Sequence, residues 1–264
     1  MKILGIPFKT VRIFLLLFLL FIIGMSTWLG KLRATDWNLP LWVVVYPING
    51  DDSQRSSRYI TSLEDDSFDD IALFLSEEAE HYEIALDTPV SFHLAPEVSI
   101  LPPPPPREGK LLHVMLWSLK LRYWAYKVDT YEGPPPDIRL FLVYYNPDTH
   151  KALDHSMGLQ KGRIGIVNVF ADRWLAAKNK VVITHELLHT VGATDKYDME
   201  TNQPLFPDGY AEPDLAPLYP QPLAEIMGGR VPDSEYASHI PANLGEVIVG
   251  PKTGYEIRWI GEMP

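Results

Sequence analysis

The chain of 264 residues contains no cysteine. This absence excludes disulfide bonds and removes thiolates as ligands for a metal ion. A chain without cysteine fits either side of a bacterial membrane, because it has no thiol groups that an oxidising or a reducing compartment could alter. Histidine and carboxylate side chains remain as candidate ligands for such an ion.

Acidic residues are missing from the first 33 positions, which hold five of the 23 lysines and arginines. Residues 34–264 consequently carry 18 positive against 34 negative groups, a net charge of −16. So acidic a domain argues against nucleic acid as a partner and against lying flat on anionic lipid. We therefore expect the hydrophobic segment at the N-terminus alone to hold the protein to a membrane.

This segment is an uncharged run of 18 residues from Ile13 to Gly30. At 1.5 Å per residue a helix of this length spans about 27 Å, close to the roughly 30 Å of a hydrocarbon core. Residues 1–33 are thus predicted to form a signal anchor with a transmembrane helix over about 13–30. A cleaved signal peptide with its apolar region at Ile13–Ile23 is the alternative, although no A-x-A-like site follows and Trp28 suits a membrane interface.

The charges around the run indicate its orientation. Three positive residues precede it and two follow it, a bias that favours a cytoplasmic N-terminus. We therefore expect a single-pass protein of the bacterial inner membrane, with residues 34–264 on the periplasmic or extracytoplasmic side.

The pattern of residues 34–264 predicts one α+β domain with a mixed sheet. Short apolar runs indicate strands, and longer periodic runs indicate helices. The predicted strands are Leu41–Ile48, Val90–Leu94, Ile138–Tyr145 and Arg163–Phe170, and the predicted helices are Phe68–Ile84, Leu111–Val128, one around residues 179–191, and Lys252–Ile260. Two proline runs, at 102–106 and 134–136, flank the long helix as stiff connectors. Beyond Gly192 frequent prolines predict a loop-rich segment.

One motif carries chemistry, His185-Glu186-Leu187-Leu188-His189. Residues four apart on a helix lie on one face, so His185 and His189 can reach the same tetrahedral metal ion. Glu186 lies one step round the helix, where a general base takes a proton from a water molecule at the metal. This H-E-x-x-H pattern predicts a zinc hydrolase.

The third ligand is predicted to follow the end of this helix. Gly192 is expected to stop the helix, because glycine tolerates the left-handed conformation of a helix terminus. The chain can then turn back and bring Asp195, ten residues after His185, towards the two imidazoles. Asp198 and Glu212 remain alternative ligands.

The stretch from His185 to Asp195 resembles the metzincin zinc peptidases, with aspartate in place of their third histidine as in the snapalysin branch. A second stretch, Ala224–Gly229, resembles their Met-turn and would place Met227 beneath the metal, although Met227 also fits a plain hydrophobic residue in a loop. The resemblance implies two lobes, at about 34–192 and 193–264. It departs in lacking a tyrosine directly after Met227, where the nearest tyrosine downstream is Tyr236.

Together these features predict a membrane-anchored zinc metallopeptidase. The resemblance implies Zn²⁺ held by His185, His189 and Asp195, with Glu186 as the base and a peptide or protein as substrate. The strand Arg163–Phe170 is a candidate sheet edge on which an extended peptide would lie. Two other classes remain open: a zinc hydrolase acting on a non-peptide amide of the cell envelope, and a non-catalytic, membrane-tethered zinc-binding or assembly protein.

Overall fold

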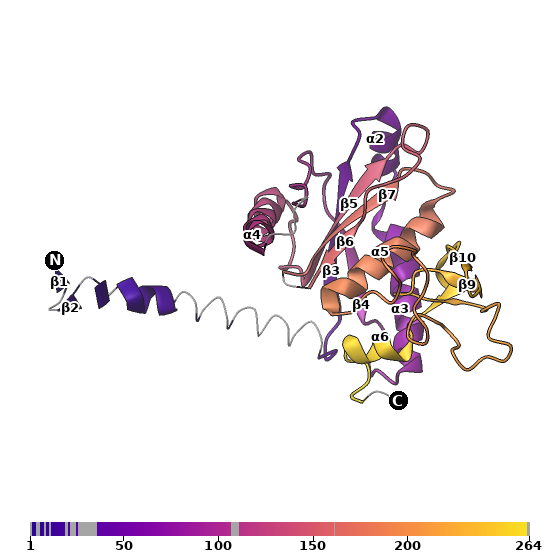
Figure 1. Ribbon diagram of the computed structural model, residues 1–264. Helices are drawn as coiled ribbons and strands as arrows, with labels where there is room; N and C mark the ends of the chain where they lie inside the picture. Colours follow the sequence, from indigo (N-terminus) through magenta and orange to yellow (C-terminus); the bar gives the residue numbers. More distant parts are fainter. Residues whose placement is uncertain are drawn as a thin grey trace.

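The computed structural model describes residues 36–106, 111–160 and 162–262, together with scattered positions before residue 26. Its centre is a five-stranded sheet of order β4-β3-β5-β7-β6 (Figure 1). The strands are β3 (Leu41–Asn49), β4 (Val90–Leu94), β5 (Ile138–Tyr145), β6 (Met157–Leu159) and β7 (Ile164–Phe170). The fold is therefore mixed α+β, as the sequence predicts.

Four strands of this sheet run parallel, and β6 alone is antiparallel to its neighbour. Parallel strands need crossover connections, which here contain α2 (Gln54–Thr61), α3 (Asp69–His81) after the 3-10 turn Asp65–Phe68, and α4 (Leu111–Val128). The parallel strands are buried on both faces and read as near-continuous apolar runs, which is why their positions were predictable. The predicted bounds of β4, β5 and α4 are confirmed.

Helices cover both faces of the sheet, and each face has its own apolar cluster. On one face α4 packs through Leu121 and Trp124 against Tyr46 and Phe141 of the strands. On the other face α3 and α5 (Ala176–Val191) pack against alternate residues of the same strands. Figure 1 shows α4 and α5 on opposite sides of the sheet.

The chain after α5 is loop-rich, as predicted. Its regular elements are the parallel pair β8 (Ala224–Glu225) and β11 (Val247–Ile248), the hairpin of β9 (Val231–Ser234) and β10 (Ala237–His239), the 3-10 turn Leu244–Glu246, and α6 (Pro251–Glu256). Its apolar residues join the cluster on the α5 face of the sheet. The C-terminal segment is thereby fixed against the helix that carries the motif.

Much of the apolar run at 13–30 lies outside the described residues, and so does the chain from 26 to 35. Near the N-terminus the structure describes two short paired strands, β1 (Lys2–Ile3) and β2 (Ile6–Pro7). Among the residues that are described, none of the helices combines the length and the hydropathy needed to cross a membrane. The signal anchor remains a prediction from the sequence.

Candidate metal centre

Helix α5 presents the motif, and its apolar residues fix its position on the sheet. Ile183 and Leu187 are buried against the strands. Asn179 fastens the start of the helix, since its side chain donates to the carbonyl oxygen of Phe170 at 2.8 Å and accepts from the amide of the same residue at 3.2 Å. The helix begins three residues earlier than the sequence predicts, at Ala176.

The helix ends at Gly192, as predicted. Its φ of 123° lies in the region that favours glycine, and its amide donates to the carbonyl oxygen of Leu188. The amide of Ala193 donates to the same carbonyl oxygen at 3.0 Å. This turn reverses the chain and returns Asp195 to the face of α5 that carries His185 and His189.

The structure brings the three predicted ligands together. Nε2 of His185, Nε2 of His189 and Oδ1 of Asp195 form a triangle with sides of 3.1 Å. Tetrahedral zinc with bonds of about 2.0–2.1 Å needs ligand atoms about 3.3–3.4 Å apart, so the triangle fits the ion to within a few tenths of an ångström.

Backbone carbonyl groups orient both imidazole rings. Nδ1 of His185 lies 2.9 Å from the carbonyl oxygen of Ile226, and Nδ1 of His189 lies 2.8 Å from that of Ala193. A carbonyl oxygen only accepts, so each Nδ1 carries the proton and each Nε2 keeps a lone pair directed at the centre of the triangle. Histidines that bind a metal through one ring nitrogen usually donate a hydrogen bond from the other in this way.

Glu186 is buried next to these ligands, with 6% of its surface exposed. Burial raises the pKa of Glu186, although His185, His189 and a backbone hydrogen bond from Gly158 act in the opposite direction. Its Oε2 atom is buried and accepts no hydrogen bond from the described residues. A buried carboxylate oxygen without a donor is costly, so this atom fits a proton-donating group that would bind next to the three candidate ligand atoms.

The charge of Asp195 is stabilised by the ligand set. Burial alone would raise the pKa of Asp195, but its contacts with the imidazoles of His185 and His189 together outweigh this and hold the pKa well below its usual range. Burial, the largest single influence, lowers the pKa of His185, but Asp195, the charge of Glu186 and the carbonyl oxygen of Ile226 together raise it by more. In the metal-free protein the aspartate is therefore ionised, which is the state in which it ligates a cation.

A carboxylate on α6 clamps the loop that carries Asp195. Oε2 and Oε1 of Glu256 accept from the amide and the hydroxyl of Thr194, at 2.9 and 2.7 Å. Oε2 also accepts from Nζ of Lys196 at 2.9 Å, and this lysine is buried. Both neighbours of Asp195 are thus fixed by one side chain 61 residues further along the chain, which no local sequence pattern indicates.

The stretch predicted as a Met-turn lies against the histidines. Ile226 contributes the carbonyl oxygen that orients His185, and Met227 is fully buried in the cluster beneath α5. Glu225 holds the turn, because its buried carboxylate accepts from the amide of Gly228 at 2.7 Å and from the hydroxyl of Thr253 at 2.5 Å. The position of Met227 agrees with both readings of the sequence, a Met-turn and a buried hydrophobic residue.

The alternative ligands lie elsewhere. Asp198 accepts hydrogen bonds from the amides of Glu200 and Thr201 in its own loop, and Glu212 is exposed. In the described part of the chain, the group that can hold a metal contains neither of them. Of the three candidates, the structure therefore joins only Asp195 to the histidines.

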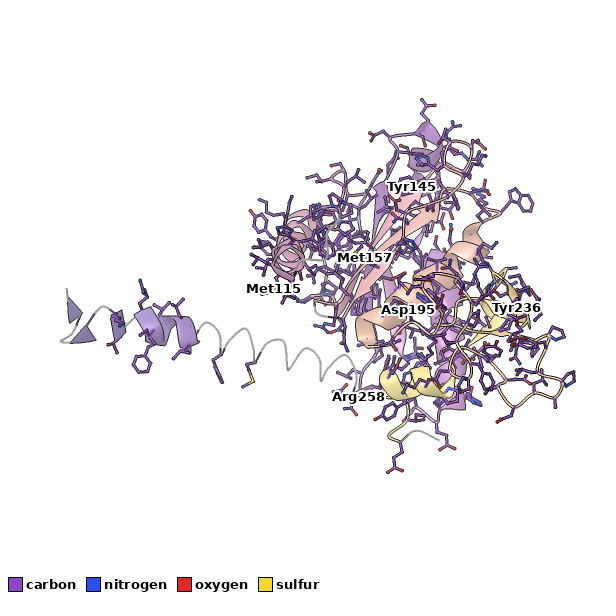
Figure 2. All side chains as sticks on the ribbon, viewed as in Figure 1. Met115, Tyr145, Met157, Asp195, Tyr236 and Arg258 are labelled. Atoms are coloured by element: carbon purple, nitrogen blue, oxygen red, sulfur yellow. The ribbon has the colours of Figure 1, made fainter. Side chains whose placement is uncertain are left out.

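A tyrosine that the sequence did not single out also lies at this site. The ring of Tyr197 is 6.2 Å from that of His185, and its phenol interacts with the carboxylate of Asp195. Burial and the charges of Asp195 and Glu186 raise the pKa of Tyr197 to about 12, so the phenol keeps its proton and can donate it to a hydrogen bond. Tyr236 is 82% exposed and lies away from Asp195 (Figure 2). The sequence signal that could have identified Tyr197 is its position two residues after the predicted ligand Asp195.

The prediction that Arg163–Phe170 forms a sheet edge is wrong. β7 lies between β5 and β6, and Met157–Leu159 forms the edge instead. The short β6 lacks an apolar pattern, so the sequence did not reveal it. β6 passes close beside α5: a Cβ atom on Gly158 would lie 2.2 Å from the carbonyl oxygen of Glu186 and 2.5 Å from Cβ of His189.

No protein-family model matches the chain, and no curated protein sequence matches it.

Proposed function

We propose that the protein is a zinc-dependent metallopeptidase of metzincin-like architecture, anchored to a membrane by its N-terminal segment. The observation that carries this proposal is the set of three donor atoms at 3.1 Å from one another, with the unpartnered oxygen of Glu186 beside them. A purely structural zinc site needs ligands but no base. One oxygen of the buried Glu186 carboxylate, Oε2, has no donor among the described residues, which favours catalysis over the non-catalytic alternative.

His185, His189 and Asp195 would hold the ion. The chemistry that zinc supplies at such a site is acidification of a water molecule and polarisation of the scissile carbonyl. Glu186 accepts the proton of the attacking water and later passes it to the leaving amine. Its raised pKa suits this exchange, because a base is most effective when its pKa approaches the operating pH.

Tyr197 is the residue placed to stabilise the transition state. Its protonated phenol can donate to the carbonyl oxygen of the substrate as that atom becomes negative. This role belongs to Tyr197 rather than to Tyr236, which is on the exposed hairpin.

The edge strand supports a peptide as substrate. β6 is the antiparallel edge of the sheet and passes beside α5 at Gly158. An extended peptide can pair with such an edge through main-chain hydrogen bonds, which recognise any peptide backbone. A peptide in that position lies alongside the helix that carries His189 and Glu186, whereas a small envelope amide gains nothing from a strand edge.

Metal analysis of ligand variants, combined with digestion of a peptide library, tests this proposal. The full chain purified in detergent should contain one zinc per molecule and cleave peptides, and Asp195→Ala should lose most of its zinc. Asp198→Ala and Glu212→Ala are matched controls that should keep both zinc and activity. Loss of zinc from Glu212→Ala but not from Asp195→Ala would overturn the ligand set. A zinc-loaded wild type that cleaves no peptide in the library would overturn the peptidase assignment.

A further inference from the structure

The long helix α4 carries an apolar surface on its outward face. Its inward face packs on the sheet through Leu121, Trp124, Ala125 and Val128. At 100° per residue the outward face consists of side chains that all remain 56–77% exposed, namely Leu112, Met115, Leu116, Leu119, Tyr123 and Tyr126. We call these six residues the outer α4 face, and Figure 2 shows Met115 at the left edge of the domain and Asp195 nearer its centre.

A helix that is apolar all round belongs in a buried environment. Exposed apolar patches of more than a few hundred Å² mark binding surfaces for a protein or a membrane. The outer α4 face spans about four turns of helix and is continuous along the axis. It is therefore a binding surface, and the surrounding charges indicate its partner.

The charges of α4 are all positive, in a domain that is strongly acidic. Leu111–Val128 contains Lys120, Arg122 and Lys127 and no aspartate or glutamate, whereas residues 34–264 carry a net charge of −16. Lys120 and Lys127 lie on one border of the outer α4 face and Arg122 lies on the other, by the same 100° spacing. The first acidic residue after the helix, Asp129, is occupied by Tyr46 and Arg139.

We propose that the outer α4 face lies in the surface of an anionic lipid bilayer, as a second membrane contact besides the N-terminal segment. Leucine and aromatic side chains on one face with lysine and arginine along its borders are typical of interfacial helices. The long side chains of Lys120 and Lys127 reach the headgroups while the apolar residues enter the acyl boundary. This proposal revises the expectation, drawn from the net charge of residues 34–264, that the N-terminal segment alone holds the protein to a membrane. Salt screens distant charges, so the local charge of α4 matters more at the lipid surface than the acidic remainder of the domain.

Two other occupants fit less well. A second copy of the chain in a symmetric pair would bring the basic borders of two α4 helices together, and like charges repel. The uncharged run at 13–30 would cover the apolar residues but would leave Lys120 and Lys127 without counter-charges. A lipid surface satisfies both the apolar and the basic features.

The proposal also determines the orientation of the proposed catalytic centre relative to the bilayer. α4 and α5 lie on opposite faces of the sheet, in separate apolar clusters. With α4 on the bilayer, the group at Asp195 faces away from the lipid, towards water-soluble substrates.

The absence of cysteine allows a direct test with single labels. Leu119→Cys and the matched control Leu205→Cys are made in the full chain, since both leucines are exposed and Leu205 lies in the loops beyond α5. Each variant is labelled with an environment-sensitive fluorophore and reconstituted in vesicles of equal parts phosphatidylcholine and phosphatidylglycerol. Circular dichroism confirms that both variants keep the fold.

The label at 119 should emit at shorter wavelength and be quenched by spin-labelled lipid, whereas the label at 205 should be quenched by aqueous iodide. Combining Leu119→Cys with Lys120→Glu and Lys127→Glu should shift the emission of the label at 119 to longer wavelength and increase its quenching by iodide. Equal iodide quenching at 119 and 205 would overturn the proposal. Shielding of position 119 from both iodide and lipid quenchers would also overturn it, because that result assigns the face to a protein partner.

Discussion

Replacing Glu256 by glutamine is expected to loosen the metal centre without touching a ligand. The change preserves the size of the side chain and one acceptor oxygen for Thr194, but it removes the charge that pairs with Lys196. The side chain of Glu256 is 15% exposed and that of Lys196 is 4% exposed, so the ammonium of Lys196 would remain buried without a carboxylate bonded to it.

The size of the effect follows from this burial. Removing one partner of a buried ion pair costs about 3–5 kcal/mol, and the lower end applies because Glu256 is partly solvated. For a domain of this size each kcal/mol lowers the melting temperature by about 2–4 °C, so we expect a decrease of about 6–12 °C. Because Thr194 and Lys196 flank Asp195, zinc affinity should fall by about 10–100-fold, as for other residues that orient ligands.

The assay is thermal unfolding of the metal-free protein together with zinc competition against a chromophoric chelator. Glu212→Gln is the matched control, because it makes the same chemical change at an exposed position. Burial alone would raise the pKa of Glu256, but the hydrogen bonds from Lys196 and Thr194 outweigh burial, so the pKa in the folded protein lies below its ordinary value. A lowered folded pKa contributes stability above the ordinary glutamate range and loses it as the pH falls through the folded value.

The difference in melting temperature between wild type and Glu256→Gln should therefore be largest at neutral pH, where Glu256 is ionised, and should decrease below about pH 4. A variant with wild-type melting temperature and zinc affinity at pH 7 would refute the clamp. So would a difference that grows as the pH falls.

Three further predictions concern catalysis, packing and location. Tyr197→Phe should keep its zinc and lower kcat/KM by about 10²-fold in steady-state assays, since one donor to the oxyanion is lost; an unchanged kcat/KM would remove Tyr197 from the mechanism. Gly158→Ala should destabilise the protein by about 1–3 kcal/mol in urea unfolding, because its Cβ would overlap α5; Gly261→Ala, with open space around it, should have no effect. The full chain should remain in the membrane pellet after an alkaline wash, and a reporter after Pro264 should be active on the exported side; release of a shorter soluble form would identify a cleaved signal.

The sheet and the grouping of the three candidate ligands could be predicted because they follow from local patterns. The buried strands are continuous apolar runs, and α4 shows helical periodicity, so their bounds agree with the structure. The distance from His185 to Asp195 is set by one helix and one glycine turn, so ten residues of sequence suffice to define it.

The features that could not be predicted depend on contacts distant in sequence or on elements with weak patterns. α2 is a polar helix with only Ser56 and Ile60 buried, and β6 has three residues. The clamp at Glu256 pairs residues about 60 positions apart. Sequence periodicity also gave no indication that the outward residues of α4 remain uncovered, because apolar residues on all sides of a helix ordinarily indicate burial.

The measurement that tests the central claim most directly compares peptide hydrolysis by zinc-loaded wild type and zinc-loaded Glu186→Gln. The substitution keeps the size of the side chain and removes the charge, so the fold and zinc content should be unchanged. A positioned general base typically contributes about 10²–10⁴-fold in rate, and we predict that the variant is at least about a hundredfold slower. Equal rates for the two zinc-loaded proteins would contradict the role of Glu186 and with it the proposed peptidase mechanism.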